Sequence, residues 1–211
     1  EGAVAAHSAK EAAVGADMVI TMVPSGPIVR SILSGADGVL AGAAKGTIIA
    51  DMSSVTPVES KEFAELAAEH GCSFLDAPVS GGEPGAVDGT LAIMVGGEAA
   101  VLEKARPVFA AMGKTITLVG PNGSGSVTKL ANQVIVNLNI AAVSEALILA
   151  TKAGADPKKV YEAIRGGLAG STVLDAKAPM MYSRNFKPGG PIAINLKDIT
   201  NVMETAKGME L

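Results

Sequence analysis

The sequence is poor in aromatic residues and in cysteine, and both shortages restrict what the protein can be. Aromatic residues make up 3% of the 211 residues, so a core must be built from Ala, Val, Ile, Leu and Met. The single cysteine, Cys72, cannot form an internal disulfide. No signal peptide is recognisable either, and the sequence therefore predicts a cytoplasmic protein in a reducing compartment.

The sequence also lacks a basic stripe and an uninterrupted apolar run. The net charge is −4, and the 17 Lys and Arg residues are scattered along the chain, which predicts no nucleic-acid partner. The longest apolar stretch, residues 134–150, is interrupted by Asn137, Asn139, Ser144 and Glu145. A membrane span needs about 18 apolar residues, so no membrane partner is predicted.

What is present in the first half is an alternation of strand and helix patterns, typical of a parallel sheet covered on both faces. The expected strands are residues 17–23, 47–51, 72–75, 91–95 and 115–119. A helix between the second and third has a clear start signal, because Thr56, Pro57 and Glu59 form a predicted capping box with proline in the first turn.

The pattern changes after Gly120. A long helix is predicted over residues 126–153, a second helix capped by Asp156, a third capped by Ser171, and a fourth that begins near Ile194. We therefore predict an α/β domain over residues 1–120 and an all-α domain over residues 121–211, joined by the long helix.

The segment Asp76-Ala77-Pro78-Val79-Ser80-Gly81-Gly82 follows a predicted strand directly. In an open α/β sheet, ligands bind beyond the carboxyl ends of the strands. Ser80 offers a hydroxyl, and Gly81 and Gly82 offer accessible backbone N–H groups that suit a small carboxylate. An ordinary glycine-rich loop would have the same sequence, so spacing alone leaves both interpretations open.

The start of the long helix carries a lysine on its polar stripe. The stripe consists of Lys129, Asn132, Gln133, Asn137 and Ser144, and the other faces are apolar enough to predict burial on most sides. Such a lysine is either paired structurally or held in a cleft for chemistry. Burial lowers a lysine pKa, which makes the group a useful acid near neutral pH.

Together these segments resemble the β-hydroxyacid dehydrogenase family, which includes 3-hydroxyisobutyrate dehydrogenase, tartronate semialdehyde reductase and 6-phosphogluconate dehydrogenase. Three more segments match in order along the chain: Met22-Val23-Pro24-Ser25, Asp51-Met52-Ser53-Ser54 and Leu196-Lys197-Asp198. The resemblance covers essentially the whole chain. Residues 76–84, 128–133 and 164–174 are most similar to the tartronate semialdehyde reductase branch.

The resemblance implies a role for each matching position. Lys129 would be the catalytic lysine, and the substrate would bind to Ser80, Gly81, Gly82 and Gln133. The cofactor, NAD or NADP, would contact Val23, Pro24, Ser54 and Lys197. No metal is implied, and neither His7 nor His70 is assigned a role. The implied partners are a small hydroxyacid or semialdehyde and, for the full-length protein, a second copy of the chain in a homo-oligomer.

The fold implied by the resemblance is a Rossmann-type dinucleotide-binding domain followed by the all-α domain. Such a domain opens with a strand, a G-x-G-x-x-G turn and a helix, and no such fingerprint occurs in this sequence. We therefore expect a chain that lacks its first βαβ unit, begins near a short strand at residues 3–6 and stops within a helical pattern. The isolated chain is then expected to bind nicotinamide cofactor weakly.

Two other functions stay open at this point. One is a related enzyme that acts on 3-hydroxyisobutyrate, glyoxylate or another small semialdehyde. The other is a noncatalytic binding or assembly module that keeps the fold. The joint presence of Lys129, Ser80 and Lys197 argues against a noncatalytic module, and a turnover assay would distinguish the two.

Overall fold

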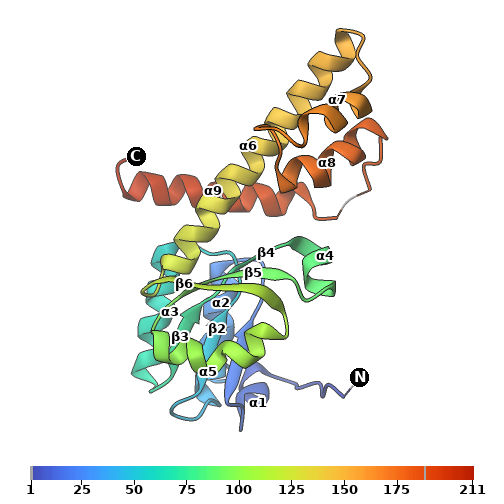
Figure 1. Ribbon diagram of the computed structural model, residues 1–211. Helices are drawn as coiled ribbons and strands as arrows, with labels where there is room; N and C mark the ends of the chain where they lie inside the picture. Colours follow the sequence, from blue (N-terminus) through green and yellow to red (C-terminus); the bar gives the residue numbers. More distant parts are fainter. Residues whose placement is uncertain (1, 188) are drawn as a thin grey trace. The chain divides into compact units, whose positions relative to one another are not determined.

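The computed structural model describes residues 2–187 and 189–211 (Figure 1). The chain forms two compact units, the first comprising residues 1–131 and 197–211 and the second residues 132–196. Each is described by itself. The first unit contains all of the strands, and the second is built from helices only within its described residues.

The first unit is built on one six-stranded sheet. Its strands are β1 (Met18–Thr21), β2 (Ile48–Asp51), β3 (Ser73–Asp76), β4 (Val79–Ser80), β5 (Leu91–Gly96) and β6 (Gly113–Gly120). The strand order is β1-β2-β3-β5-β4, and β6 also pairs with β5.

The expected parallel sheet is only partly correct. β1, β2 and β3 are parallel neighbours, and so are β5 and β6, but β5 runs antiparallel to both β3 and β4. β4 has two residues and no sequence signal of its own, because its partner lies across the intervening helix rather than next to it in sequence. The sheet is therefore mixed.

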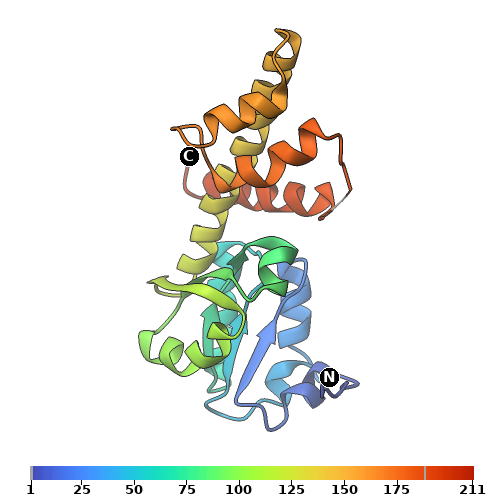
Figure 2. The ribbon, with the colours of Figure 1, turned by 45° about the vertical axis from the view of Figure 1, so that its right-hand side comes forward.

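Helices cover both faces of the sheet, as the sequence predicts (Figures 1 and 2). One face packs against α5 (Ala99–Ala110), with Ile93, Leu102 and Phe109 buried between them. The other face packs against several elements and buries residues such as Ile49 and Phe63. These elements are α1 (Ala9–Ala13), α2 (Gly26–Leu33), the 3-10 helix η1 (Val39–Ala41) and α3 (Pro57–Glu69).

The predicted start of α3 is confirmed. The Thr56 hydroxyl accepts a hydrogen bond from the Glu59 backbone N–H, and the Glu59 carboxylate accepts one from the Thr56 N–H at 2.8 Å. The short strand expected at residues 3–6 is wrong, since these residues have no regular structure and are exposed. An isolated strand without a neighbour has no partner for its backbone groups.

Helix α6 (Ser124–Lys152) is 29 residues long. It is the one helix of the described chain that is long and apolar enough to cross a membrane, by length and composition only, and a core helix of a soluble protein meets the same criterion. The expected burial on most sides is wrong for this chain. Ile135, Leu138 and Leu149 are 62%, 66% and 72% exposed, because no element of the described chain covers them.

The second unit has a small core of its own. It packs α6 against α7 (Pro157–Ile164) and α8 (Thr172–Tyr182) through Val143, Leu147, Tyr161 and other apolar residues. Asp156 and Ser171 cap these helices as predicted, and the last helix, α9 (Ile192–Gly208), begins two residues before the expected start.

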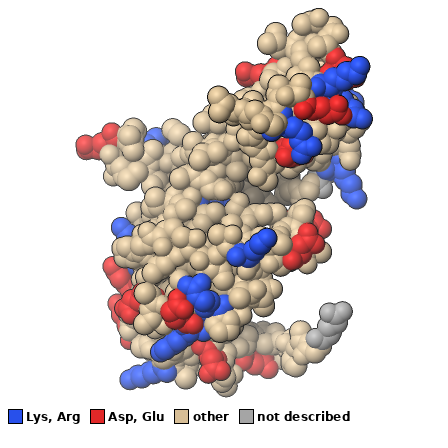
Figure 3. Space-filling model, in the orientation of Figure 1, with Lys and Arg blue, Asp and Glu red and all other residues tan. Residues whose placement is uncertain are grey.

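On the face shown in Figure 3, basic and acidic side chains are intermixed. The predicted homo-oligomer stays a prediction.

Candidate active site

The three parallel strands β1, β2 and β3 end in register at one edge of the sheet. Thr21 pairs with Asp51, and Asp51 pairs with Asp76. All three side chains are buried, with exposed fractions of 4%, 1% and 1%. The carboxyl edge of an open α/β sheet is where ligands bind, and here it carries two buried carboxyl groups side by side.

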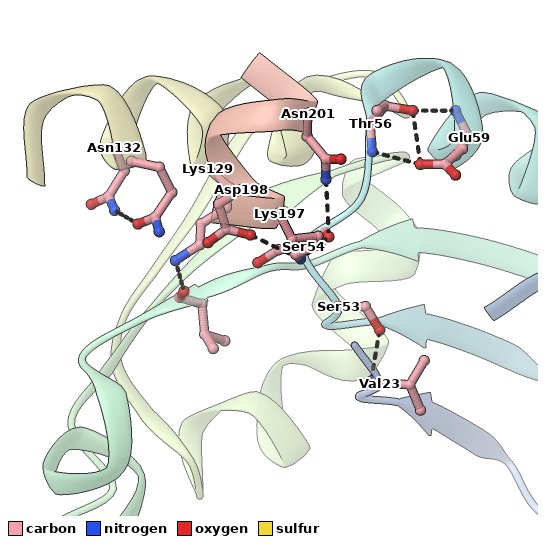
Figure 4. A network of polar contacts seen from close by, with 12 residues as sticks. Val23, Ser53, Ser54, Thr56, Glu59, Lys129, Asn132, Lys197, Asp198 and Asn201 are labelled. Carbon is pink, nitrogen blue, oxygen red and sulfur yellow. Dashed lines mark hydrogen bonds and ion pairs between the residues drawn. The ribbon is translucent and has the colours of Figure 1, made fainter. Parts of the chain in front are cut away.

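The first of these groups, Asp51, organises the loop after β1. Its Oδ1 accepts hydrogen bonds from the Thr21 hydroxyl at 2.8 Å and from the Ser53 backbone N–H at 3.1 Å. The Ser53 hydroxyl in turn accepts a hydrogen bond from the Val23 N–H at 3.0 Å (Figure 4). Burial raises the pKa of Asp51, against the lowering effect of these hydrogen bonds. The loop that contains Val23 and Pro24 is thereby held at the carboxyl edge.

The segment after β3 forms the second part of the edge. β4 places Val79 opposite Ile93 and Ser80 opposite Ala92 of β5, so the backbone of this segment is fixed by the sheet. Gly81 and Gly82 follow with φ angles of 140° and 62°, in the left-handed region that favours glycine. A short helix, α4 (Gly82–Val87), begins there. Both glycines are exposed, so their backbone groups are accessible.

Lys129 lies in the second turn of α6 and reaches the segment just described. Its Nζ donates a hydrogen bond to the Val79 carbonyl at 2.8 Å (Figure 4). The side chain is 9% exposed, and burial lowers the pKa of Lys129; the nearby Asp198 charge opposes this effect, and the nearby Lys197 charge adds to it. An ammonium has three donor hydrogens, so the contact with Val79 leaves donor capacity for another oxygen.

Helix α9 brings an ion pair and an amide to the same edge. Lys197 Nζ lies 2.8 Å from Asp198 Oδ1 and donates a hydrogen bond to the Ser54 carbonyl at 2.6 Å. Asn201 donates to the same carbonyl at 3.3 Å. Figure 4 shows Asp198 between the two lysines, and its side chain is 4% exposed. Because α9 begins 63 residues after Lys129, only tertiary structure brings these charges together.

The structure places most of the predicted site residues along this one edge. Lys129 contacts the residue that precedes Ser80, and Lys197 contacts the backbone of Ser54. Gln133 belongs to the second unit, where its side-chain oxygen accepts a hydrogen bond from Asn132 at 2.9 Å. It is buried, with 7% exposure.

Sequence reasoning missed three residues that contribute to the edge. Ser53 rather than Ser54 holds the Val23 backbone, Asp198 faces both lysines, and Asp76 contacts α6. All three stand inside or beside motifs that the sequence shows. Their partners, however, lie 30 to 50 residues away in the case of Ser53 and Asp76, and no local pattern reports such pairing.

The loop after β1 could accept a flat, apolar ring. Met22 is 59% exposed, Pro24 is exposed and Val23 is half-buried, so the loop after β1 presents apolar surface to a flat ring. The Ser53 contact holds this loop in place. Lys197 adds a cation at the neighbouring strand end.

Comparison with known proteins identifies the family. Residues 1–120 match the family described as the NAD binding domain of 6-phosphogluconate dehydrogenase. Residues 123–211 match the NAD-binding region of NADP-dependent 3-hydroxyisobutyrate dehydrogenase. The fold and these matches define an NAD(P)-dependent β-hydroxyacid dehydrogenase, an oxidoreductase whose cofactor is NAD or NADP. The chain belongs to the 3-hydroxyisobutyrate dehydrogenase family.

Individual relatives span most of the chain. It is 49% identical over 210 residues to 2-hydroxy-3-oxopropionate reductase of Escherichia coli (strain K12), covering 100% of this chain and 72% of that protein. It is 40% identical to 3-hydroxyisobutyrate dehydrogenase of Pseudomonas aeruginosa, covering 100% and 73%. The solved structure of 3-hydroxyisobutyrate dehydrogenase from Mycobacterium tuberculosis with L-serine has a TM-score of 0.87 and 34% identity, covering 97% and 72%.

Proposed function

We propose that this β-hydroxyacid dehydrogenase reduces tartronate semialdehyde (2-hydroxy-3-oxopropanoate) to D-glycerate with NADH or NADPH, reversibly, and that Lys129 is its general acid and base. The observation that carries the mechanism is the buried Lys129 ammonium at the carboxyl edge of the sheet, next to the Ser80 segment. The 49% identity to 2-hydroxy-3-oxopropionate reductase supports the choice of substrate.

The proposed mechanism assigns the proton to Lys129. When bound, the reduced nicotinamide cofactor supplies a hydride to the aldehyde carbon. The aldehyde oxygen then gains negative charge, and a cation that also donates a proton lowers the barrier. Lys129 provides both from Nζ, and the Val79 carbonyl holds that atom in place. In the reverse direction the neutral amine accepts the proton from the hydroxyl.

The substrate carboxylate is assigned to the segment of Ser80, Gly81 and Gly82. The Ser80 hydroxyl and the two glycine N–H groups are donors, and a carboxylate accepts several hydrogen bonds. The segment begins one residue after the carbonyl that binds Lys129, so a molecule held there presents its far end to the ammonium. Gln133, four residues beyond Lys129 in sequence, is proposed to add a contact to the substrate.

The cofactor is assigned to the neighbouring strand ends. Val23 and Pro24 would pack against the nicotinamide ring, and Ser54 and Lys197 would contact the cofactor from the end of β2 and from α9. The fixed loop after β1 supports this assignment, because an ordered apolar surface orients a flat ring without a further loss of backbone entropy.

A matched pair of substrates tests the proposed specificity. Tartronate semialdehyde carries a hydroxyl where the semialdehyde of 3-hydroxyisobutyrate carries a methyl group, and the two are otherwise the same. With the full-length protein we expect kcat/KM to be at least about 100-fold higher for tartronate semialdehyde, because a site built to bind a hydroxyl is left with unpaired polar groups by the methyl analogue. Steady-state rates with both aldehydes measure this ratio.

A ratio below one would identify the protein as a 3-hydroxyisobutyrate dehydrogenase, which the 40% identity to the Pseudomonas enzyme makes the second candidate. Glyoxylate belongs in the same panel as a small aldehyde without the central carbon. Absence of turnover with all three, at saturating NADH and NADPH, would contradict the proposed reaction and favour a noncatalytic module.

Replacing Asp198 should shift the pH dependence of the reaction. The Asp198 charge raises the pKa of Lys129, so Asp198→Asn lowers that pKa further. Reduction requires protonated Lys129, so the pH at which its rate falls should be lower in the variant than in the wild type. Profiles of kcat against pH at saturating cofactor measure the shift. Lys197→Met removes a like charge near Lys129, so the fall in rate should move to higher pH in that variant. Equal pH profiles for the wild type and both variants would contradict the assignment of this fall to Lys129.

A further inference from the structure

The buried carboxyl group of Asp76 joins the end of β3 to the start of α6. Its Oδ1 accepts a hydrogen bond from the Gly123 N–H at 2.8 Å, and its Oδ2 accepts one from the Ser126 N–H at 3.0 Å. The first N–H groups of a helix have no partner within the helix, so a carboxylate that binds two of them fixes both the position and the direction of its first turn.

The packing around this carboxyl group is too close for side chains at two positions. A Cβ atom on Gly96 would lie 2.5 Å from Asp76 Oδ1 and 2.8 Å from the Gly125 nitrogen. A Cβ atom on Gly125 would lie 2.4 Å from the backbone oxygens of Asp76 and Met94. The first turn of α6 is therefore seated directly on the ends of β3 and β5, with the carboxylate between them.

Two further contacts fix the same turn. The hydroxyls of Ser126 and Ser60 are 2.7 Å apart, which joins α6 to α3, and both serines are buried. The Asn122 amide donates a hydrogen bond to the Phe74 carbonyl of β3 at 3.0 Å. Each contact belongs to the first compact unit.

The spacing connects this junction to Lys129. Lys129 follows Ser126 by three residues, about one helical turn, and its acceptor Val79 follows Asp76 by three residues. The hydrogen bond between Ser126 and Asp76 and the hydrogen bond between Lys129 and Val79 thus join the same two segments, three residues apart on each. A displacement of α6 at the junction moves Nζ relative to the Val79 carbonyl.

We propose that Asp76 is a positioning residue for Lys129, whose carboxyl group sets the register between α6 and the Ser80 segment so that the ammonium stays buried beside the substrate site. This inference rests on the proposed catalytic role of Lys129. Asp76 does not contact the ammonium in the structure and is not assigned to substrate, cofactor or proton transfer.

The neighbouring Asp51 provides a matched control for Asp76. The two residues are register partners at the ends of parallel strands, both are 1% exposed, and burial raises the pKa of each. Only Asp76 contacts α6, whereas Asp51 contacts Thr21 and Ser53. Replacing each by asparagine removes the same carboxyl group from the same kind of environment.

The test measures Lys129 directly in the full-length protein. Trace acylation with acetic anhydride at a series of pH values, read by mass spectrometry of the peptide that contains Lys129, gives the pKa of this lysine without turnover. We expect Asp76→Asn to raise that pKa towards the value of an exposed lysine, because a displaced α6 no longer buries the ammonium. Asp51→Asn should leave it unchanged.

Kinetics provide the second measurement. Asp76→Asn should lower kcat by about 10- to 100-fold through misplacement of the acid, with KM for the cofactor within about twofold. Asp51→Asn should instead change KM for the cofactor, since Asp51 supports the loop with Val23. An Asp76→Asn protein that melts near the wild-type temperature but keeps the wild-type Lys129 pKa and kcat would overturn the inference. Equal shifts of the Lys129 pKa in Asp76→Asn and Asp51→Asn would also overturn it.

Gly96→Ala decides the question if Asp76→Asn does not fold. The added methyl group would push against the Asp76 carboxylate and the Gly125 nitrogen without removing a charge, so it should raise the Lys129 pKa in the same direction. A wild-type Lys129 pKa in a folded Gly96→Ala protein overturns the inference. The labelling experiment measures the Lys129 pKa without catalysis, so it tests the role of Asp76 by itself. An active Lys129→Met protein would overturn the proposed catalytic role of Lys129 and leave the labelling result unaffected.

Discussion

Lys129→Met is expected to lower kcat for the reduction by roughly two to four orders of magnitude, the usual contribution of a positioned acid–base group. Methionine keeps the length and the apolar stem of lysine, and the side chain it replaces is buried. The variant should therefore fold, and the loss should be chemical. Steady-state rates with tartronate semialdehyde and NADH or NADPH measure it, with a melting curve to establish folding.

Lys129→Arg tests the same assignment by shape and charge. Guanidinium stays protonated at any working pH, and it is planar where ammonium is compact. It can therefore stabilise developing negative charge but cannot exchange a proton, and we expect most of the activity to be lost. In both variants KM for the cofactor should change little, since the proposed cofactor contacts at Val23, Pro24, Ser54 and Lys197 remain.

A well-folded Lys129→Met protein with near-normal kcat would contradict the mechanism. Lys129 would then be a structural lysine whose function is the hydrogen bond to the Val79 carbonyl. In that case Lys129→Met should lower the melting temperature, because the partly buried Val79 carbonyl would lose a charged donor. The two interpretations thus predict opposite results for activity.

Ser80→Ala is expected to raise KM for the aldehyde by about 10- to 150-fold and to leave cofactor affinity nearly unchanged. The loss of a hydrogen bond to a charged group costs about 1.5–3 kcal/mol, and each 1.4 kcal/mol is about a factor of ten. β4 fixes the backbone at Ser80, so removal of one hydroxyl should not move the segment. Initial rates over a range of aldehyde and cofactor concentrations separate the two effects.

Ser31→Ala is a suitable control for this experiment. Ser31 is exposed on α2, and its hydroxyl donates to the Ile28 carbonyl of its own helix. Its replacement should leave both KM values within about twofold of wild type. If Ser80→Ala instead weakened cofactor binding alone, Ser80 would belong to the cofactor pocket. The assignment of the substrate carboxylate to the Ser80 segment would then be wrong.

Local signals in the sequence determined most of the secondary structure and the family. The capping box of Thr56 and Glu59, the caps Asp156 and Ser171, and the strands β2 and β5 were all predictable, because each depends on residues a few positions apart. The motifs around Ser80, Lys129 and Lys197 predicted the class of enzyme for the same reason, and the comparisons confirm that class. The roles of the individual residues stay predictions.

Other features were decided only by tertiary structure. The antiparallel direction of β5, the two-residue strand β4, and the approach of Asp198 to Lys129 all involve partners that are distant in the sequence. Asp76 shows the difference most clearly. Its place at a strand end is visible in the sequence, but its hydrogen bonds to α6 span 47 and 50 residues. Periodicity and capping depend on residues that are close along the chain. A buried carboxyl group instead binds the N–H groups that folding brings next to it, because burying it without hydrogen bonds costs several kcal/mol.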